Sequence, residues 1–250
     1  IVFGAVAAAV STSTLGHASA AEIRVYSGGA AQEVLRVLGP EFEQQTGHRV
    51  AFTFRLVTEI QRMLAEGDQA DVVLLPIPLL AATQKTRAFR PEGPIVLARV
   101  GIGLIVRQGQ THPDISTPEA VRRMLLEARR IALPTASVPS GRHLTRIMAE
   151  LGIADAVSSK LLFRAAIDGG PELVAKGEAD IGLYLVSEVH TTKDVSVVGL
   201  LPPPFQNFVV YAAALPVDSA APDAAVAFLK FVSDPAKAER WKASGFELER

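Results

Sequence analysis

The sequence predicts an α/β protein with a mainly parallel sheet covered by helices on both faces. Along most of the chain, short apolar runs of strand length alternate with stretches that space their apolar residues as a helix does. Asp71–Leu75 (DVVLL) is a continuous apolar run, which is typical of a strand buried on both sides. Glycines and prolines stand at the ends of these runs, where strands and helices stop.

The first third of the chain supplies three strands and two helices. Glu22–Tyr26 alternates polar and apolar residues, which indicates a strand. Gly47 stops the helix that follows it, and Pro76 and Pro78 end the third strand. The expected strands are Glu22–Tyr26, Val50–Phe54 and Asp71–Leu75, and the expected helices are Ala30–Gln45 and Thr58–Glu66.

The rest of the chain continues the alternation. Ile95–Val106 is a long β-branched run that contains Gly101 and Gly103. Thr117 and Pro118 form a helix start, with Thr as the N-cap and Pro at the first helical position, and this helix should run to about Arg130. Further strands are predicted at Arg130–Leu133, Leu161–Ala165, Asp180–Leu185, Val195–Leu201 and Phe208–Leu215, and further helices at Ser140–Leu151, Pro171–Lys176, Pro222–Ser233 and Pro235–Ser244.

The first twenty residues are typical of an export signal. Ile1–Val10 is an apolar run, and Ala18-Ser19-Ala20 fits the rule of small residues before a cleavage site. The apolar run is too short to span a bilayer by itself. We therefore expect residues 1–20 to be a cleavable signal peptide and the mature protein to be periplasmic.

The composition excludes several classes of partner and chemistry. Net charge is −1, from 25 Lys and Arg against 26 Asp and Glu, so no basic excess supports a nucleic-acid partner. Aromatic residues are only 6% of the chain, which argues against a base-stacking platform. Cysteine is absent, which excludes disulfides, cysteine-based zinc sites and thiol catalysis.

Side chains for catalysis or metal binding are scarce. The five histidines are scattered without the spacing of metal ligands, so no metal and no other cofactor is expected. The nucleophile motif Gly-Xaa-Ser-Xaa-Gly and the phosphate-binding loop are absent. Ser27-Gly28-Gly29 lacks the full glycine pattern of a dinucleotide site. No nucleophile with its base is therefore assigned.

Four short turns each combine small residues with a helix start. They are Ser27–Ala30, Phe54–Thr58, Ser137–Arg142 and Asp168–Pro171. A helix start presents unpaired N–H groups and a partial positive charge. All four turns should lie at the carboxyl edge of a sheet, where doubly wound folds bind ligands. Several helix starts around one cleft predict an anion site without a metal. Ordinary capping is the alternative for any single turn.

Several segments resemble type 2 periplasmic solute-binding proteins of ABC importers, in their molybdate-binding branch. Glu22–Leu35 (EIRVYSGGAAQEVL) resembles the opening of that branch, and Pro222–Gly245 resembles its closing helices. Gly67–Leu75, Ser137–Leu151 and Leu173–Leu183 resemble it as well. The resemblance covers residues 22–250 and is specific for the superfamily rather than for the ligand.

This resemblance implies two doubly wound α/β lobes joined by two crossover strands, with a ligand cleft between the lobes. Lobe one would be about 21–97 plus 207–250, and lobe two about 98–206. The crossovers would lie near Val96–Val100 and Gln206–Val210. A protein of this kind is expected to be a monomer that binds a small anionic ligand and delivers it to an ABC permease at the inner membrane.

The resemblance also implies which residues face the ligand. The Ser27 hydroxyl and the N–H groups after it should point at the anion, and Ser140 begins the facing helix of lobe two. Tyr184 stands where the family often has a ligand-side tyrosine, although a buried strand tyrosine is the alternative. The predicted ligand residues are Ser27, Gly28, Gly29, Arg55, Thr58, Ser140, Gly141, Arg142 and Tyr184.

One turn departs from the molybdate-binding pattern. Molybdate binders usually carry a Gly-Ser-Ser-Gly type turn where this chain has Arg55–Thr58. Hydroxyl and N–H groups suit a small tetrahedral dianion, whereas the planar fork of an arginine suits a carboxylate. Arg55, Arg142 and His143 therefore indicate an organic acid, unless they are solvated surface charges. The ligand class stays open between a molybdate-like oxyanion and an organic acid.

Two functions compete. The first is a solute receptor for an ABC importer, whose lobes close on an anion. The second is an isomerase of a small polycarboxylate, because periplasmic aconitate isomerases resemble this branch. An isomerase needs a base, for which His143, Glu188 and Tyr184 are candidates, although Glu188 is also explained as a solvent-facing helix acid. A signalling partner of a sensor protein is a third class.

Overall fold

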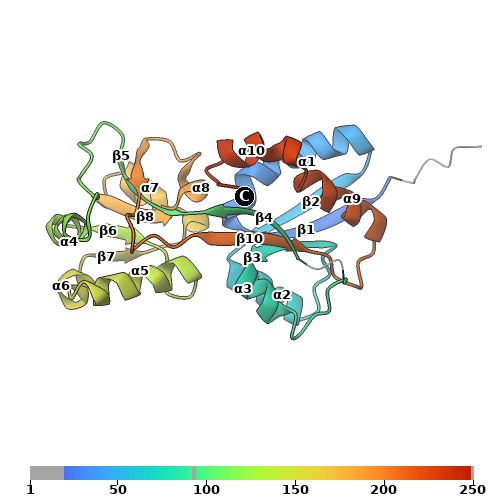
Figure 1. Ribbon diagram of the computed structural model, residues 1–250, viewed down its shortest axis with the longest axis horizontal. Coiled ribbons are helices and arrows are strands. Elements are labelled where there is room, and N and C mark those ends of the chain that lie inside the picture. The colour runs from blue at the N-terminus through green and yellow to red at the C-terminus, as the bar shows by residue number, and fades with distance from the viewer. Residues whose placement is uncertain (1–19, 92–93, 249–250) are drawn as a thin grey trace, which may run out of the picture.

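Two five-stranded sheets make up the framework of this computed structural model, which describes residues 20–91 and 94–248 (Figure 1). The strands are β1 (Glu22–Gly28), β2 (Arg49–Arg55), β3 (Val72–Pro76), β4 (Ile95–Val100), β5 (Ile102–Arg107), β6 (Ile131–Leu133), β7 (Leu161–Phe163), β8 (Ile181–Leu185), β9 (Val195–Leu200) and β10 (Val209–Ala214). Their order is β2-β1-β3-β10-β4 in one sheet and β7-β6-β8-β5-β9 in the other. The predicted signal peptide lies outside the described residues, except for Ala20.

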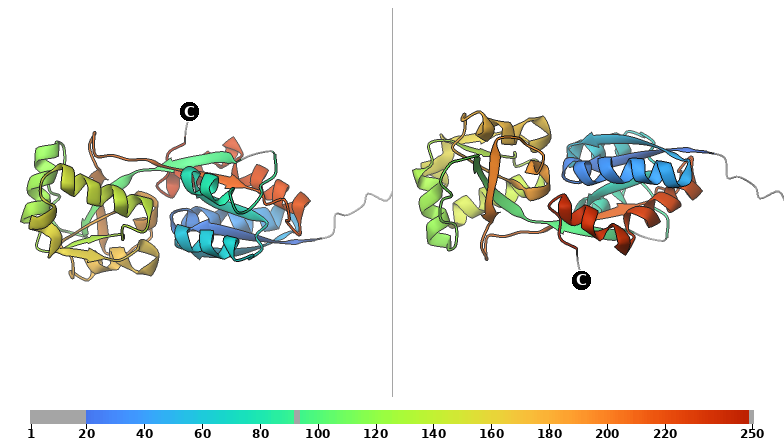
Figure 2. Two further views of the ribbon diagram at one scale, coloured as in Figure 1. Left: turned by 90° about the horizontal axis from the view of Figure 1, so that it is seen from below. Right: turned by 90° about the horizontal axis from the view of Figure 1, so that it is seen from above.

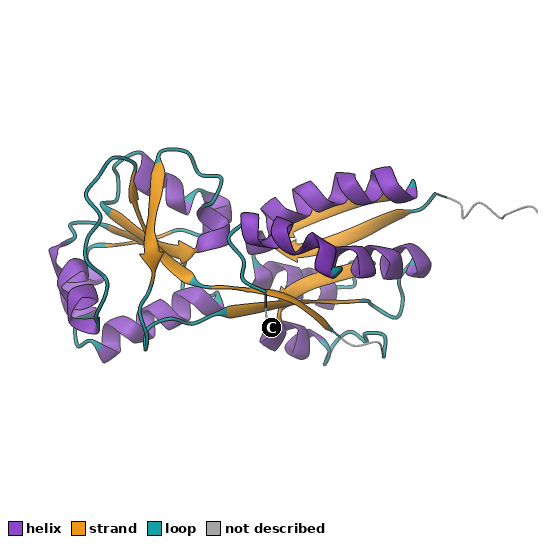
Figure 3. Cartoon of the chain, turned by 45° about the horizontal axis from the view of Figure 1, so that its top comes forward, coloured by secondary structure: helices purple, strands orange, loops and turns teal. Residues whose placement is uncertain are grey.

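Helices flank both sheets (Figure 3). They are α1 (Gln32–Thr46), α2 (Val57–Ala65), α3 (Ile77–Thr83), α4 (Pro118–Glu127), α5 (Pro139–Glu150), α6 (Ala154–Ser158), α7 (Gly170–Ala175), α8 (Val186–Val189), α9 (Pro222–Val232) and α10 (Ala238–Ala243), with 3-10 turns η1 (Gly29–Ala31), η2 (Ala166–Asp168) and η3 (Pro235–Lys237). Thr117 caps α4 as predicted, since its hydroxyl accepts the Ala120 N–H at 3.1 Å. The helix ends at Glu127 rather than Arg130. Within the described ranges, no helix has both the length and the apolar character to cross a membrane.

Each sheet is mainly parallel, as predicted, but contains one antiparallel strand, which was not predicted. β1 runs parallel to β2 and β3, and β6 runs parallel to β7 and β8. In contrast, β10 is antiparallel to β3 and β4, and β5 is antiparallel to β8 and β9. The antiparallel strands are those that pass directly from one sheet to the other, without the helical crossover that a parallel connection needs. The predicted single run Ile95–Val106 is accordingly two strands, one in each sheet.

The chain passes between the sheets twice. Gly101 separates β4 of the first sheet from β5 of the second, and residues 201–208 lead back to β10 (Figure 2). The Gln206 side chain links the two passages, because it accepts the Ile102 N–H at 2.9 Å and donates to the Ile102 carbonyl at 3.0 Å. We call the first sheet with its helices lobe one and the second lobe two. The proposed lobe limits, 97/98 and 206/207, fall within β4 and just before β10.

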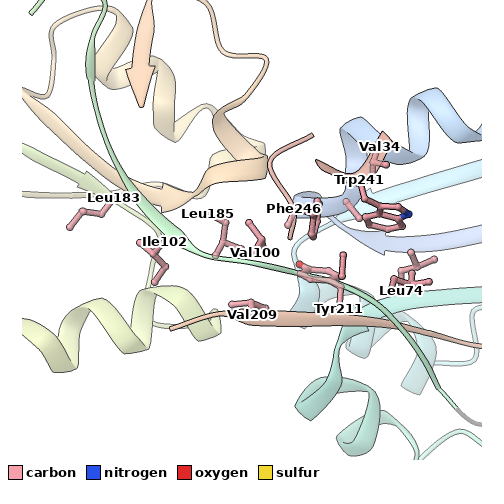
Figure 4. Close-up of a cluster of buried hydrophobic side chains, with 14 of the residues drawn as sticks. Val34, Leu74, Val100, Ile102, Leu183, Leu185, Val209, Tyr211, Trp241 and Phe246 are labelled. Carbon is pink, nitrogen blue, oxygen red and sulfur yellow. The ribbon is translucent and has the colours of Figure 1, made fainter. Parts of the chain in front are cut away.

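One apolar core continues from lobe one into lobe two along these passages. Val100 and Ile102 are fully buried on either side of Gly101, and Leu185 and Tyr211 belong to the same core (Figure 4). Each fully buried aliphatic side chain stabilises the fold by roughly 1.5–3 kcal/mol. The first passage is therefore packed into both lobes, and Leu201 and Phe205 bury part of the second.

A buried carboxylate ties the amino-terminal and carboxy-terminal parts of lobe one together. Asp71, just before β3, accepts hydrogen bonds from the Arg24 backbone N–H at 2.8 Å and its Nε at 3.2 Å. It also accepts the Ser219 hydroxyl and the Ala220 N–H, both at 2.9 Å. Burial alone would raise the pKa of Asp71, but these hydrogen bonds outweigh it and hold the pKa below its usual range.

We expect Asp71→Asn to lower the free energy of unfolding by about 3 kcal/mol at neutral pH, because an amide cannot accept all four hydrogen bonds. The lowered pKa means that the ionised form stabilises the fold above the ordinary aspartate pKa, so the difference should shrink as acid protonates the wild type. Urea unfolding at several pH values measures this. Asp68→Asn, at an exposed position nearby, is the control and should change little. Equal losses of unfolding free energy in the two variants would contradict the stabilising role of the Asp71 hydrogen bonds.

Candidate functional site

A small cavity of about 40 Å³ lies between the two lobes. We call it the interlobe cavity. Its lining is largely apolar and comes from both sides. The lining residues are Gly29, Leu56, Val57, Pro76, Val209 and Tyr211 from lobe one, and Pro134, Val138, Pro139, Ser140, Ala165, Ala166, Ile167, Leu185 and Glu188 from lobe two.

Helix starts surround the interlobe cavity. The first residues of α2, α5 and η1 line it, and so do the residues where β3 meets α3 and β8 meets α8. Three of the four turns predicted from the sequence are therefore together, whereas Asp168–Pro171 lies beyond Ile167, outside the lining. Neither α2 nor α5 has a side-chain cap at its start. The free N–H groups at the start of each helix, and the positive end of its dipole, therefore lie on the side of the cavity.

Two hydroxyl groups face the interlobe cavity without partners. Ser140 and Tyr211 are both almost completely buried, and neither hydroxyl makes a hydrogen bond within the described part of the chain. Burial, and then the nearby Glu188 carboxylate, raise the pKa of Tyr211, so its hydroxyl stays protonated and available as a donor. Because both residues line the cavity, their hydroxyl groups are available to donate hydrogen bonds to acceptor atoms of a ligand or to water.

Glu188 brings the only carboxyl group into the cavity lining. It lies at the third position of α8. Burial raises the pKa of Glu188 to about 7, and a hydrogen bond from the Leu185 N–H offsets only part of that rise. Near neutral pH the group therefore exists both as a neutral acid, which donates a hydrogen bond, and as a carboxylate, which accepts a proton. Glu188 is half-buried, since it lines the interlobe cavity on one side and an open hollow with Glu33 on another.

Three of the predicted small residues have packing roles beside the cavity. Ser27 is fully buried, and its hydroxyl donates to the Gly28 carbonyl at 3.0 Å. A Cβ at Gly28 would lie 2.6 Å from a Val57 methyl carbon and 3.0 Å from the Tyr211 hydroxyl oxygen. A Cβ at Gly141 would collide with the Thr135 carbonyl oxygen. These glycines allow the close packing that brings the helix starts together, while Gly29 itself lines the cavity.

The structure does not bring the predicted arginines into the cavity. Arg55 ends β2, where it donates to the Phe54 carbonyl and lies 3.7 Å from Glu59. Arg142 is exposed and uses its guanidinium on the carbonyls of Ala136 and Ser137. Thr58 also lies outside the lining. No Lys, Arg or His is among the lining residues, so the cavity as described holds no arginine fork for a carboxylate.

Strand alternation places Tyr184 away from the cavity. Leu185 lines the cavity, and successive side chains of a strand point to opposite faces. Tyr184 is fully buried within lobe two, and its hydroxyl donates to the Arg164 carbonyl at 3.1 Å. Burial is the first cause that raises its pKa. The tyrosine that does line the cavity is Tyr211, which sequence reasoning missed.

His143 also lies elsewhere. Its Nε2 is 2.8 Å from the Phe205 carbonyl in the returning passage, and its Nδ1 is 2.8 Å from the Arg146 guanidinium. The ring therefore links α5 to the passage between the lobes and is not in the cavity lining. Among the described residues, no group of three or more His, Asp or Glu side chains has the arrangement of a metal site.

Ile167 divides the space between the lobes. It comes from η2 of lobe two, and a Cβ at Gly29 of lobe one would lie 3.5 Å from it. On one side of Ile167 is the interlobe cavity, and on another is an open hollow of about 710 Å³ that Arg36 and Arg55 border. Ile167 and Gly29 both line the cavity and thus form part of its wall from opposite lobes.

Two α/β lobes with a cavity between facing helix starts are the architecture of a two-lobed binding protein. The chain belongs to the bacterial extracellular solute-binding proteins, whose family model matches residues 23–247. This membership confirms the predicted superfamily.

Two relatives match almost the whole chain. It is 27% identical over 243 residues to an aconitate isomerase from Pseudomonas sp, and this match covers 95% of this chain and 92% of that protein. It is 23% identical over 253 residues to the molybdate-binding protein ModA of Escherichia coli strain K12, covering 97% and 96%.

Solved structures share the fold. The Azotobacter vinelandii periplasmic molybdate-binding protein superposes with a TM-score of 0.75 at 18% identity, covering 91% of this chain and 100% of that one. The sulfate-binding protein SubI of Mycobacterium tuberculosis H37Rv gives a TM-score of 0.71 at 16% identity, covering 90% and 86%. These likenesses confirm the predicted two-lobed fold class.

We expect Glu188→Gln to raise the free energy of unfolding at about pH 8 by up to about 3 kcal/mol. The raised pKa means that the folded protein holds this proton more tightly than the unfolded chain, so the wild type loses stability as pH rises from about 4.5 to about 7. The neutral amide avoids that loss. The gain should disappear below about pH 4.5, which urea unfolding across pH measures. Glu172→Gln, at an exposed position, is the control. A gain in stability from Glu188→Gln that did not vary with pH would contradict the raised pKa of Glu188.

Proposed function

We propose that the protein is a periplasmic receptor that captures a small anion, a molybdate-like oxyanion or an organic acid, for an ABC importer. Its export would follow from the predicted signal peptide, and it would act as a monomer on a permease at the inner membrane. The observation that carries the proposal is the set of uncapped helix starts and unpaired hydroxyls around one interlobe cavity.

Dipoles and hydroxyl groups suit a small anion of high symmetry. The starts of α2 and α5 come from different lobes, so an anion between them attracts both and favours closure of the lobes. Ser140 and Tyr211 add one donor from each lobe. The absence of a cation among the lining residues favours the oxyanion over a polycarboxylate, and the small volume favours it as well.

A thermal-shift screen tests the receptor function. We expect one or more of molybdate, tungstate, sulfate, citrate and trans-aconitate to stabilise the protein. At a hundred times its dissociation constant, a ligand adds about 2.7 kcal/mol of stability, which raises the melting temperature by several degrees. Titration calorimetry then gives the affinity. If no anion shifts the melting temperature and none binds in the calorimeter, the proposed function is wrong.

Filling the interlobe cavity should abolish capture. We expect Gly29→Leu to weaken binding by roughly 100-fold or more, because its side chain would occupy the ligand volume and press on Ile167 across the lobes. Gly29→Ala is the matched control, since its Cβ would meet Ile167 at an ordinary contact distance of 3.5 Å. Calorimetry with the anion selected in the screen compares the two. Equal affinities for both variants would place the ligand elsewhere.

The second candidate is an isomerase of a small polycarboxylate. Glu188 favours it, since a buried carboxyl group with a pKa of about 7 suits proton transfer. The carboxylate would take a proton from a CH₂ carbon next to a double bond, and the electron pair would shift along the allylic system. Return of a proton from the carboxyl group to the far carbon would move the double bond without a net change in composition. The 27% identity to an aconitate isomerase also supports this candidate.

Incubation with trans-aconitate separates the two functions. An isomerase would form cis-aconitate, which NMR detects, and would exchange carbon-bound protons in deuterated water. Glu188→Gln would then lower turnover by about 100- to 10,000-fold while the substrate still binds. The absence of turnover, with binding of any anion intact, would eliminate the isomerase and leave the receptor.

A further inference from the structure

We propose that Glu188 sets the specificity of the interlobe cavity by carrying a proton, so that capture of an anion takes up one proton. This inference rests on the proposed anion-binding function and deepens it. It assigns Glu188 the role of a hydrogen-bond donor to the ligand. An isomerase base would start from the opposite, ionised form of the same group.

The enclosure of Glu188 depends on contacts between the lobes. Glu188 lies on α8, which follows β8 of lobe two but packs against η1 and α1 of lobe one. The carboxy-terminal segment of lobe one also reaches α8, since a Cβ at Gly245 would lie 3.1 Å from the Ser187 backbone nitrogen. Glu188 is half-buried and also borders an open hollow with Glu33, and separation of the lobes would expose it further to water. Closure of the lobes and the charge state of this carboxyl group are linked.

No positive charge in the cavity lining compensates an ionised Glu188. The lining contains no Lys, Arg or His, and the other polar side chains are Ser140 and Tyr211. Nearby groups on elements packed around α8 are mostly acids or phenols. The titratable and charged groups on the elements that contact α8 are Tyr184, Asp168, Glu33, Arg36, Glu41 and Glu43. Tyr211 lines the cavity beside Glu188. Glu172 lines the neighbouring hollow, and His190 follows α8.

A bound anion selects the protonated form of Glu188. An ionised carboxylate in the cavity would repel the anion and would offer it no hydrogen. The protonated carboxyl donates an O–H and completes a set of donors with Ser140 and Tyr211. Burial raises the pKa of Glu188 to about 7, so the free protein near neutral pH contains both forms, and ligand binding pulls the ionised fraction into the protonated one.

Calorimetry over pH tests the inference with molybdate, sulfate and trans-aconitate as probes. Molybdate and sulfate do not take up protons themselves between about pH 6 and about pH 9, so the proton uptake measured there belongs to the protein. For each probe that binds, we expect the affinity to fall by up to about tenfold per pH unit above about pH 7. The binding heats in two buffers of different ionisation enthalpy should give uptake of up to one proton, and this count needs no variant.

Glu188→Gln mimics the protonated group and should bind the same probe with an affinity that no longer depends on pH. Glu172→Gln, at an exposed position, should keep the wild-type pH dependence. An affinity of the wild type that is constant over this pH range, or an unchanged pH dependence in Glu188→Gln, would overturn the inference and leave the receptor function intact. Failure of every probe to bind either protein would overturn the receptor function and this inference together.

Discussion

The interlobe cavity depends on the direct passage of the chain between two sheets. Because β4 continues into β5 across Gly101, and residues 201–208 return to β10, each lobe turns the ends of its central strands toward the other. Helices begin at those strand ends, so their free N–H groups gather in one place. The Gln206 side chain fixes the two passages to each other through Ile102. The gathering of helix starts around the cavity is thus a consequence of topology, before any polar side chain is considered.

Most elements of the fold could be predicted because their signals are local. The alternation in Glu22–Tyr26 and the capped start at Thr117 each depend on a few neighbouring residues. The direction of strand pairing could not be predicted in this way, because β10 pairs with β3 and β4 over more than a hundred residues of sequence. The helices α3, α6 and α8 were missed because none exceeds seven residues, which is too short for a periodic pattern. The equally short α7 was predicted from the Pro and Gly at its ends.

The candidate site shows the same division between local and non-local information. Gly29 and Ser140 line the cavity, since glycine turns and helix starts are visible in sequence. Arg142 has the charge for a ligand, but the carbonyls of its own helix start occupy its guanidinium. Tyr184 and Leu185 are neighbours on one strand, and only the packing of β8 decides which of them faces the cavity. Residue types were therefore predictable, whereas orientation was not.

Receptor and enzyme differ in what they require of Glu188, and the two requirements conflict within one cavity. A base must be ionised when its substrate arrives, yet like unit charges about 4 Å apart repel by roughly 4 kcal/mol at an effective dielectric constant of about 20. An isomerase of a polycarboxylate therefore needs cations to hold the carboxylates, and none lines this cavity. Arg36 and Arg55 border only the hollow beyond Ile167. The enclosed geometry consequently suits a protonated Glu188 and a single compact anion, whereas catalysis would require the lobes to bring that hollow and the cavity into one space.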